Sequence, residues 1–114
     1  MENKLEYSFD DEPVNKFCYD LDNKKIEAHF KGYYDLIRDE YIETPCVWVL
    51  ENWKYAKIKI GDEQKLYDLN MHIGIFGLIL YMKYIDDKEL EIHVLTVDDR
   101  YLTLLFKEPN LSLK

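Results

Sequence analysis

Side chains that could bind a metal ion or act as nucleophiles are few and scattered along the chain. The three histidines, His29, His72 and His93, lie far from one another and from the two cysteines, Cys18 and Cys46. A structural zinc site usually draws its four ligands from closely spaced Cys and His residues. Both cysteines fall in apolar segments, where a thiol usually serves as a small packing group. The sequence therefore predicts no metal site, no cofactor and no Cys–His catalytic pair.

Carboxylates, by contrast, occur in adjacent pairs. They are Asp39–Glu40, Asp62–Glu63, Asp86–Asp87 and Asp98–Asp99, together with the run Asp10-Asp11-Glu12. A glycosidase needs two carboxyl groups facing each other across a cleft, one of them with a raised pKa, whereas adjacent carboxylates in turns both stay hydrated. The chain also lacks a phosphate-binding glycine loop and a nucleophile elbow. We expect these pairs to form turns, and we expect the protein not to be an enzyme.

One acidic segment differs because tyrosines are interleaved with its acids. Its residues are Tyr33, Tyr34, Asp35, Asp39, Glu40, Tyr41 and Glu43. Tyrosine gives rigid amphipathic contact area at protein interfaces, and carboxylates complement a basic surface. We therefore take these seven residues as candidates for binding a protein partner. The alternative is that they form the solvated surface of a helix or loop.

The charge of the whole chain narrows the class of partner. The net charge is −8, and the first 43 residues hold twelve acidic residues against six basic ones. Nucleic acids and anionic membranes are bound largely through Lys and Arg, so the sequence predicts neither as a partner. A basic protein domain is favoured, because charge would steer its association. The same charge could also serve solubility alone.

Length and composition indicate one folded domain spanning residues 1–114. Hydrophobic residues make up 47% of the chain and charged residues 33%, which is typical of a globular protein. Residues 1–6 are charged and no apolar signal region follows. The longest apolar run, residues 73–82, is about half the ~20 residues that cross a bilayer. We expect a cytoplasmic monomer or small homo-oligomer with Cys18 and Cys46 as free thiols.

Alternation of apolar and polar residues dominates the chain and predicts strands. Strands are expected over residues 5–9, 16–21, 25–31, 46–50, 75–84, 89–97 and 101–107. Short connections make neighbouring strands antiparallel, with a hairpin around residues 22–25, a three-stranded meander from residue 75 and a short terminal edge strand. The fold class is mainly β, bordering on α+β. We expect a single curved antiparallel sheet, a sandwich or a half-barrel, with one or two short helices.

The helices are expected between Gly32 and Gly74. Tyr33, Ile37 and Tyr41 fall at helical spacing, so this segment is either a short helix or a loop with an extended piece. Asn52 stands where a helix would be capped, and residues 53–60 fit one helical face as well as a strand. For them we favour a short helix. Residues 67–74 are expected to be a connector.

The apolar face of this β structure supplies the expected core. Its members are Phe17, Tyr19, Ile26, Phe30, Val47, Val49, Ile79, Tyr81, Ile92, Val94, Leu104 and Phe106. Trp53 is also assigned to packing.

Three segments give the chain a family resemblance. They are Gly32-Tyr33-Tyr34-Asp35, Pro45–Lys54 and Asp98-Asp99-Arg100-Tyr101, and they resemble small acidic bacterial immunity proteins of polymorphic or contact-dependent inhibition toxin systems. The resemblance implies a cytosolic inhibitor that binds one toxin domain, often a basic nuclease, and covers its active site or substrate groove. It carries over no functional residues.

Two other functions stay open. One is a small-ligand-binding β-barrel or sandwich that uses Tyr and Trp to line a cavity. The other is a phage-type inhibitor of a nucleic-acid-binding protein. A hollow apolar pocket would favour the ligand binder, and a filled core would favour an inhibitor.

Overall fold

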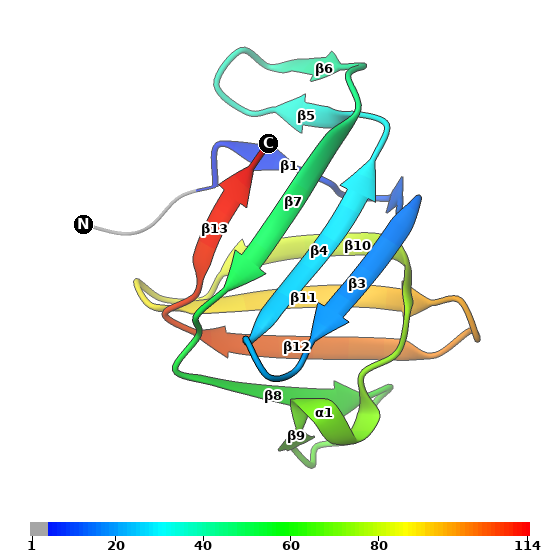
Figure 1. The fold of residues 1–114 in the computed structure, drawn as a ribbon, viewed down its shortest axis with the longest axis vertical. Helices are drawn as coiled ribbons and strands as arrows, with labels where there is room; N and C mark the ends of the chain where they lie inside the picture. The colour runs from blue at the N-terminus through cyan, green and yellow to red at the C-terminus, as the bar shows by residue number, and fades with distance from the viewer. Residues whose placement is uncertain (1–4) are drawn as a thin grey trace.

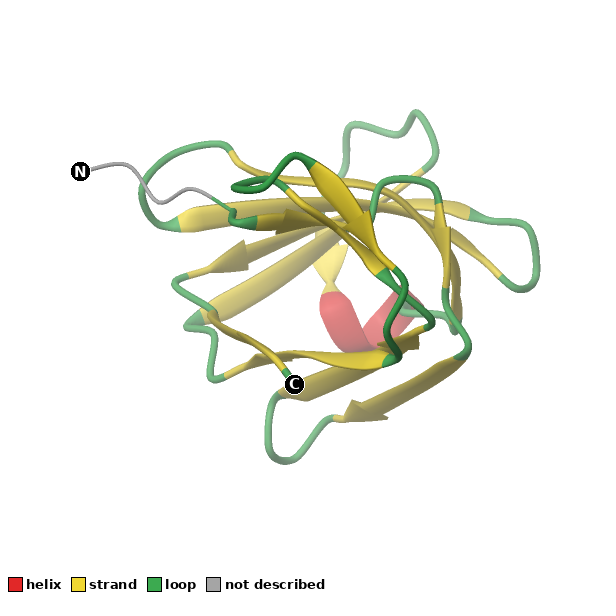
Figure 2. Cartoon of the chain, turned by 90° about the horizontal axis from the view of Figure 1, so that it is seen from above, coloured by secondary structure: helices red, strands yellow, loops and turns green. Residues whose placement is uncertain are grey.

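Two antiparallel β-sheets packed face to face form the body of the protein. The computed structural model describes residues 5–114. In Figure 1 a four-stranded sheet lies in front with its strands running diagonally, and a six-stranded sheet lies behind it with strands running across the view. Figure 2 shows the same layers from above. Strands that cross at such a steep angle are typical of orthogonally packed sheets.

The sheets have a defined strand order. The four-stranded sheet consists of β13 (Asn110–Leu113), β7 (Cys46–Glu51), β4 (Lys25–Phe30) and β3 (Lys16–Asp20). The six-stranded sheet consists of β2 (Glu12–Pro13), β10 (Phe76–Tyr84), β11 (Glu89–Thr96), β12 (Tyr101–Lys107), β8 (Tyr55–Ile60) and β9 (Tyr67–Asp68). A third sheet, which we call the arm, consists of β1 (Tyr7–Ser8), β5 (Tyr33–Asp35) and β6 (Glu40–Ile42). The short helix α1 (Leu69–His72) precedes β10.

This architecture confirms the prediction of a mainly antiparallel β fold, in its sandwich form. The expected hairpin is present as β3 and β4, with Tyr19 opposite Ile26. The expected meander is present as β10, β11 and β12. The terminal strand β13 lies at the edge of the four-stranded sheet, as predicted.

The helix predicted after Asn52 is wrong. Asn52 adopts a left-handed φ of 56° and turns the chain instead of capping a helix. The following residues form β8, which pairs with β12 and buries Ile58 completely. Local spacing allowed both structures here, and pairing with a long neighbouring strand decided between them. The connector predicted over residues 67–74 contains β9 and α1.

The strand predicted over residues 5–9 is also shorter than expected. Only Tyr7 and Ser8 form β1, and the chain then turns at Asp11, which has a φ of 60°. The acidic segment that follows β1 includes the short strand β2. Proline is tolerated at position 13 because β2 lies at the edge of the six-stranded sheet.

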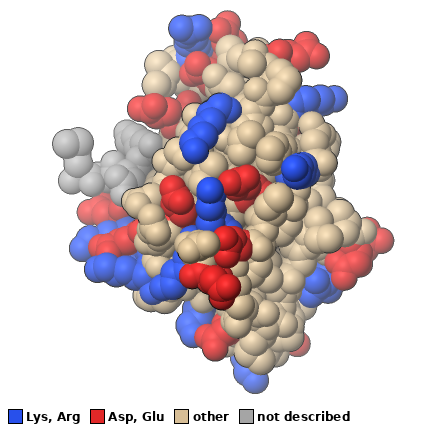
Figure 3. Space-filling view, viewed as in Figure 1, with Lys and Arg blue, Asp and Glu red and all other residues tan. Residues whose placement is uncertain are grey.

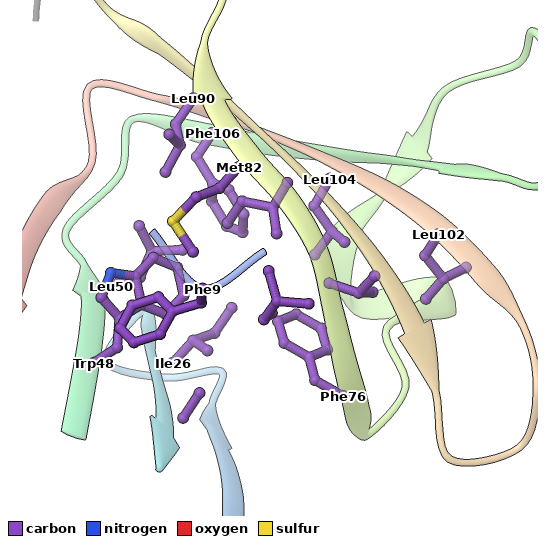
Figure 4. Close-up of a cluster of buried hydrophobic side chains, with 14 of the residues drawn as sticks. Phe9, Ile26, Trp48, Leu50, Phe76, Met82, Leu90, Leu102, Leu104 and Phe106 are labelled. Atoms are coloured by element: carbon purple, nitrogen blue, oxygen red, sulfur yellow. The ribbon is translucent and has the colours of Figure 1, made fainter. Parts of the chain in front are cut away.

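The core lies between the inner faces of the two main sheets (Figure 4). Predicted members that are buried there or along these strands are Ile26, Phe30, Val49, Ile79, Ile92, Val94, Leu104 and Phe106. Trp53 is also buried, as predicted, and its ring meets that of Phe106 edge-on at 5.0 Å. Burial of this many apolar side chains is the main source of stability.

Four predicted core residues are only half-buried, namely Phe17, Tyr19, Val47 and Tyr81. The first two lie on the edge strand β3, which leaves one side open. In β7 the inward positions are those of Cys46, Trp48 and Leu50, so Val47 faces outward.

Tyr81 was expected in the core but faces outward, and the cause is the irregular register of β10. This strand has register irregularities between Phe76 and Leu78 and between Ile79 and Tyr81. A bulge reverses the inward and outward positions beyond it. Met82 is therefore buried, while Tyr81 pairs with His93 on the outer face.

The two cysteines lie on opposite faces of the four-stranded sheet. Cys18 is exposed and Cys46 is buried, and both are free thiols in the structure. Burial raises the pKa of Cys46, which lowers its reactivity as a nucleophile. Along residues 5–114, the helical structure is too short to span a bilayer.

Candidate functional site

The structure places the seven candidate partner-binding residues on and beside one hairpin. Six of them lie in β5, in β6 or in the turn between these strands, and Glu43 follows β6 directly. The hairpin projects above the ends of β4 and β7 in Figure 1, where β1 completes the arm. Tyr33, Ile37 and Tyr41 therefore do not share a helical face. They lie on one strand, at the tip and on the other strand.

The turn at the tip is built by its own carboxylates. Asp35 accepts hydrogen bonds from the backbone N–H groups of Ile37 and Arg38, at 2.9 and 3.0 Å. Such a side-chain turn is a common use of Asp. Asp39 has a φ of 57° and accepts a hydrogen bond from the Tyr34 hydroxyl, which raises the pKa of Tyr34. Two of the four predicted binding carboxylates thus also serve the fold of the arm.

The base of the arm depends on close packing at Gly32. A Cβ atom on Gly32 would lie 2.6 Å from the backbone oxygen of Ile42 and would overlap the Tyr41 ring. The Ile42 oxygen belongs to the paired backbone of β6 and cannot move aside, whereas the exposed Tyr41 side chain could. The glycine is therefore required to hold β5 and β6 at this position.

The tip of the arm carries an exposed apolar pair that the sequence analysis missed. Ile37 is 73% exposed and Leu36 is 47% exposed, and the turn sets both beyond the paired strands. The sequence signal was present, since two apolar residues stand in a strongly polar segment. The spacing of Ile37, four residues from both Tyr33 and Tyr41, is compatible with a helix as well as with a loop, so the sequence alone does not place Leu36 and Ile37 at an exposed tip.

Charged side chains surround this apolar tip. Asp39, Glu40 and Glu43 are exposed, and Asp35 is partly buried. Arg38 lies among them, 3.9 Å from Asp35 and 3.8 Å from Glu40, with most of its side chain in solvent. Figure 3 shows acidic and basic side chains around the arm at the top of the view. The tip therefore has an apolar centre and a mainly acidic rim.

A groove runs along the edge strand β13 beside the arm. Its two sections have volumes of about 550 and about 350 Å³ and share Glu6, Tyr7 and Leu111 as lining residues. Tyr84 and Pro109 line the larger section, while Tyr33, Asp35, Ile37 and Leu113 line the smaller one. We call the two sections together the β13 groove. It lies at sheet edges and not between the inner faces of the sandwich.

Comparisons of the chain with protein-family models, with curated proteins and with solved structures found no match. Within residues 5–114, no three His, Cys, Asp or Glu side chains converge on a point where a metal ion could be held.

The ionisation of the Tyr41 hydroxyl in the arm can be titrated directly. The Glu12 carboxylate, with some burial, raises the pKa of Tyr41 to about 12. The folded protein therefore keeps a proton on Tyr41 that the unfolded chain loses above its usual pKa of 10.0. This interaction stabilises the fold below pH 10.0, and that stabilisation is lost as the pH rises towards 12.

The measurement is the ultraviolet absorbance of phenolate, compared between wild type and Tyr41→Phe. Because the protein has ten tyrosines, the difference between the two curves isolates Tyr41. We expect its midpoint near 12, and we expect Glu12→Gln to move it towards 10.0. A wild-type midpoint already at 10.0 would show that Tyr41 and Glu12 do not interact.

Proposed function

We propose that the protein is a non-enzymatic, immunity-type inhibitor that binds a basic toxin domain through the arm. The observation that carries this proposal is the exposed tip of Leu36 and Ile37 inside a mainly acidic rim. Interfaces commonly combine an apolar centre, which supplies most of the affinity, with a charged rim that sets specificity and association rate. A toxin that acts on nucleic acid presents a basic groove that complements such a rim.

The filled core favours this function over that of a small-ligand binder. Large side chains fill the space between and around the sheets, and the fully buried ones include Trp48, Phe30 and Phe106. The two sections of the β13 groove are lined by residues of the sheet edges and the arm. Ligand pockets of this size are usually apolar and concave, whereas this groove is partly lined by Glu6 and Asp35.

The experiment compares two adjacent acidic pairs at opposite ends of the molecule. Asp39→Asn/Glu40→Gln removes charge from the arm, and Asp62→Asn/Glu63→Gln removes the same charge from the loop after β8. Amide replacements keep the hydrogen-bond acceptors of Asp39 and Glu63, which bind Tyr34 and Tyr67. Both variants should therefore fold normally.

The partner to use is the toxin domain encoded by the gene immediately upstream. Its association with wild type should slow strongly as salt rises, because the Debye length shrinks from ~10 Å at 0.1 M to ~3 Å at 1 M. The arm variant should slow association more than the control variant, with a smaller change in dissociation. Failure of the upstream product to bind, or equal effects of the two variants, would contradict this proposal.

A further inference from the structure

We propose that the β13 groove binds an extended, lysine- or arginine-containing segment of a partner protein, which adds to the four-stranded sheet as a fifth strand beside β13. The inference deepens the proposed function, on which it rests, by naming how part of the partner is held. Addition of a strand to a free sheet edge is a recurring mode of peptide recognition.

The backbone of β13 offers unpaired hydrogen-bonding groups to the groove. Val47 and Lys114 exchange both backbone hydrogen bonds, at 3.0 and 2.9 Å. Hydrogen-bonded pairs alternate along an antiparallel ladder, so Ser112 also bonds to Val49, whereas Leu111 and Leu113 direct their N–H and C=O groups away from β7. No other described strand pairs with this edge.

The edge also lacks the usual protection against strand pairing. Natural edge strands are commonly blocked by Lys, Glu, Pro or a bulge. The residues of β13 are Asn110, Leu111, Ser112 and Leu113, which include none of these, and their pairing with β7 is regular. A proline and a lysine stand only at the two ends of this edge, as Pro109 and Lys114. The opposite edge strand, β3, carries Lys16 and Asp20, and its Phe17 ring packs on Phe76 of the six-stranded sheet at 4.3 Å.

The lining of the groove indicates the chemistry of its occupant. Glu6 and Asp35 are the charged residues among the described residues that line it, and both are acidic. Leu111 and Leu113 supply apolar contacts, and Tyr7 and Tyr33 flank them. A strand that alternates apolar and basic residues would pair with the backbone, contact the leucines and place its charges near the carboxylates.

A second copy of this chain fits the groove less well. Each copy carries a net charge of −8, so joining two such edges would bring like charges together. The arm also stands beside the groove, where Ile37 and Tyr33 line one section. This leaves room for a single strand more readily than for a second sheet.

The test uses ¹⁵N-labelled protein and a capped synthetic hexapeptide of alternating Lys and Val as the probe. Binding should shift the Leu111 and Leu113 amide signals and slow their exchange with solvent. A matched peptide with N-methylated valines keeps the side chains and the charge but lacks the donors of one edge. It should bind about tenfold or more weakly, because it loses several backbone hydrogen bonds. A Glu–Val hexapeptide should bind still less well.

A pair of protein variants provides the second arm of the test. Leu113→Pro removes the outward N–H, a change that an edge strand tolerates, whereas Leu113→Ala shortens the side chain more than proline does but keeps the N–H. We expect the proline variant to bind the Lys–Val peptide more weakly than the alanine variant. The N-methylated peptide keeps the proposal testable even if the proline variant does not fold.

Three results would overturn the inference. They are no response of Leu111 and Leu113 to the peptide, equal binding of the N-methylated peptide, and a dimer whose interface already protects these two amides. None of these results bears on the rim carboxylates Asp39 and Glu40, which do not line the groove. Failure at the edge and failure of the arm are therefore distinguishable.

Discussion

Replacement of Trp48 by Ala should lower the free energy of unfolding by about 3–5 kcal/mol, the range found when large aromatic side chains are removed from cores. Trp48 is fully buried in β7, and its ring meets the Phe9 ring edge-on at 6.2 Å. Phe9 in turn stacks on Phe30 at 4.0 Å. The substitution would therefore leave a cavity beneath the four-stranded sheet and remove support from the segment that joins β1 to β2.

Trp48→Phe should cost distinctly less than Trp48→Ala. The indole Nε1 is buried and makes no hydrogen bond of proper geometry, although it lies close enough to the Tyr7 hydroxyl to oppose the rise in pKa that burial causes. Replacing the indole by a phenyl ring breaks no strong hydrogen bond, so the loss of stability should come mainly from the smaller side-chain volume. We therefore expect Trp48 to contribute mainly through its size.

Urea unfolding followed by circular dichroism measures both changes. Val97→Ala is the control, because Val97 is 63% exposed and its truncation should change stability by no more than about 0.5 kcal/mol. A Trp48→Ala variant as stable as the control would show that this part of the core is not packed as described.

Much of the fold was predictable because simple alternation and short turns coincide in most of the chain. The strands β3, β4, β11 and β12 match their predicted ranges within a residue or two. In these strands one face is more buried than the other, so the pattern of apolar residues records the pairing directly. Polar turns such as the one at Asp99, with its φ of 65°, mark where each strand ends.

Prediction failed where a single residue changes the direction or phase of the backbone. The left-handed conformation of Asn52 and the irregularity of β10 between Ile79 and Tyr81 each change the path of the residues after them, and neither has a distinctive local pattern. The other irregularity of β10, between Phe76 and Leu78, falls at Gly77, and glycine within a strand is a typical sign of a bulge. The candidate site was likewise predictable only in part. The acidic and tyrosine residues of the arm are visible in the sequence, whereas the exposure of Leu36 and Ile37 depends on a turn. The free edge of β13 depends on sheet order, which is set by contacts far apart in the chain.

Substitution of Ile37 by Asp should weaken binding of the toxin partner about 30-fold or more, the loss expected when an interface hot spot is removed. Ile37 is the most exposed of the large apolar side chains along residues 5–114, and the Asp35 carboxylate fixes the turn beneath it. Its loss should appear mainly as faster dissociation, because interface contacts act on the dissociation rate. The folded protein should be as stable as wild type, since an exposed side chain contributes little to the core.

This substitution also separates apolar contact from charge. Asp adds a negative charge to an already acidic rim, so steering towards a basic partner should be unchanged or slightly stronger. Weaker binding then comes from the tip itself, through the lost apolar contact and the cost of burying a carboxylate in its place, and not from weaker steering. Ile75→Asp is the matched control, because Ile75 is 57% exposed and precedes β10, away from the arm. If Ile37→Asp and Ile75→Asp bind the partner equally well, the tip is not the centre of the interface.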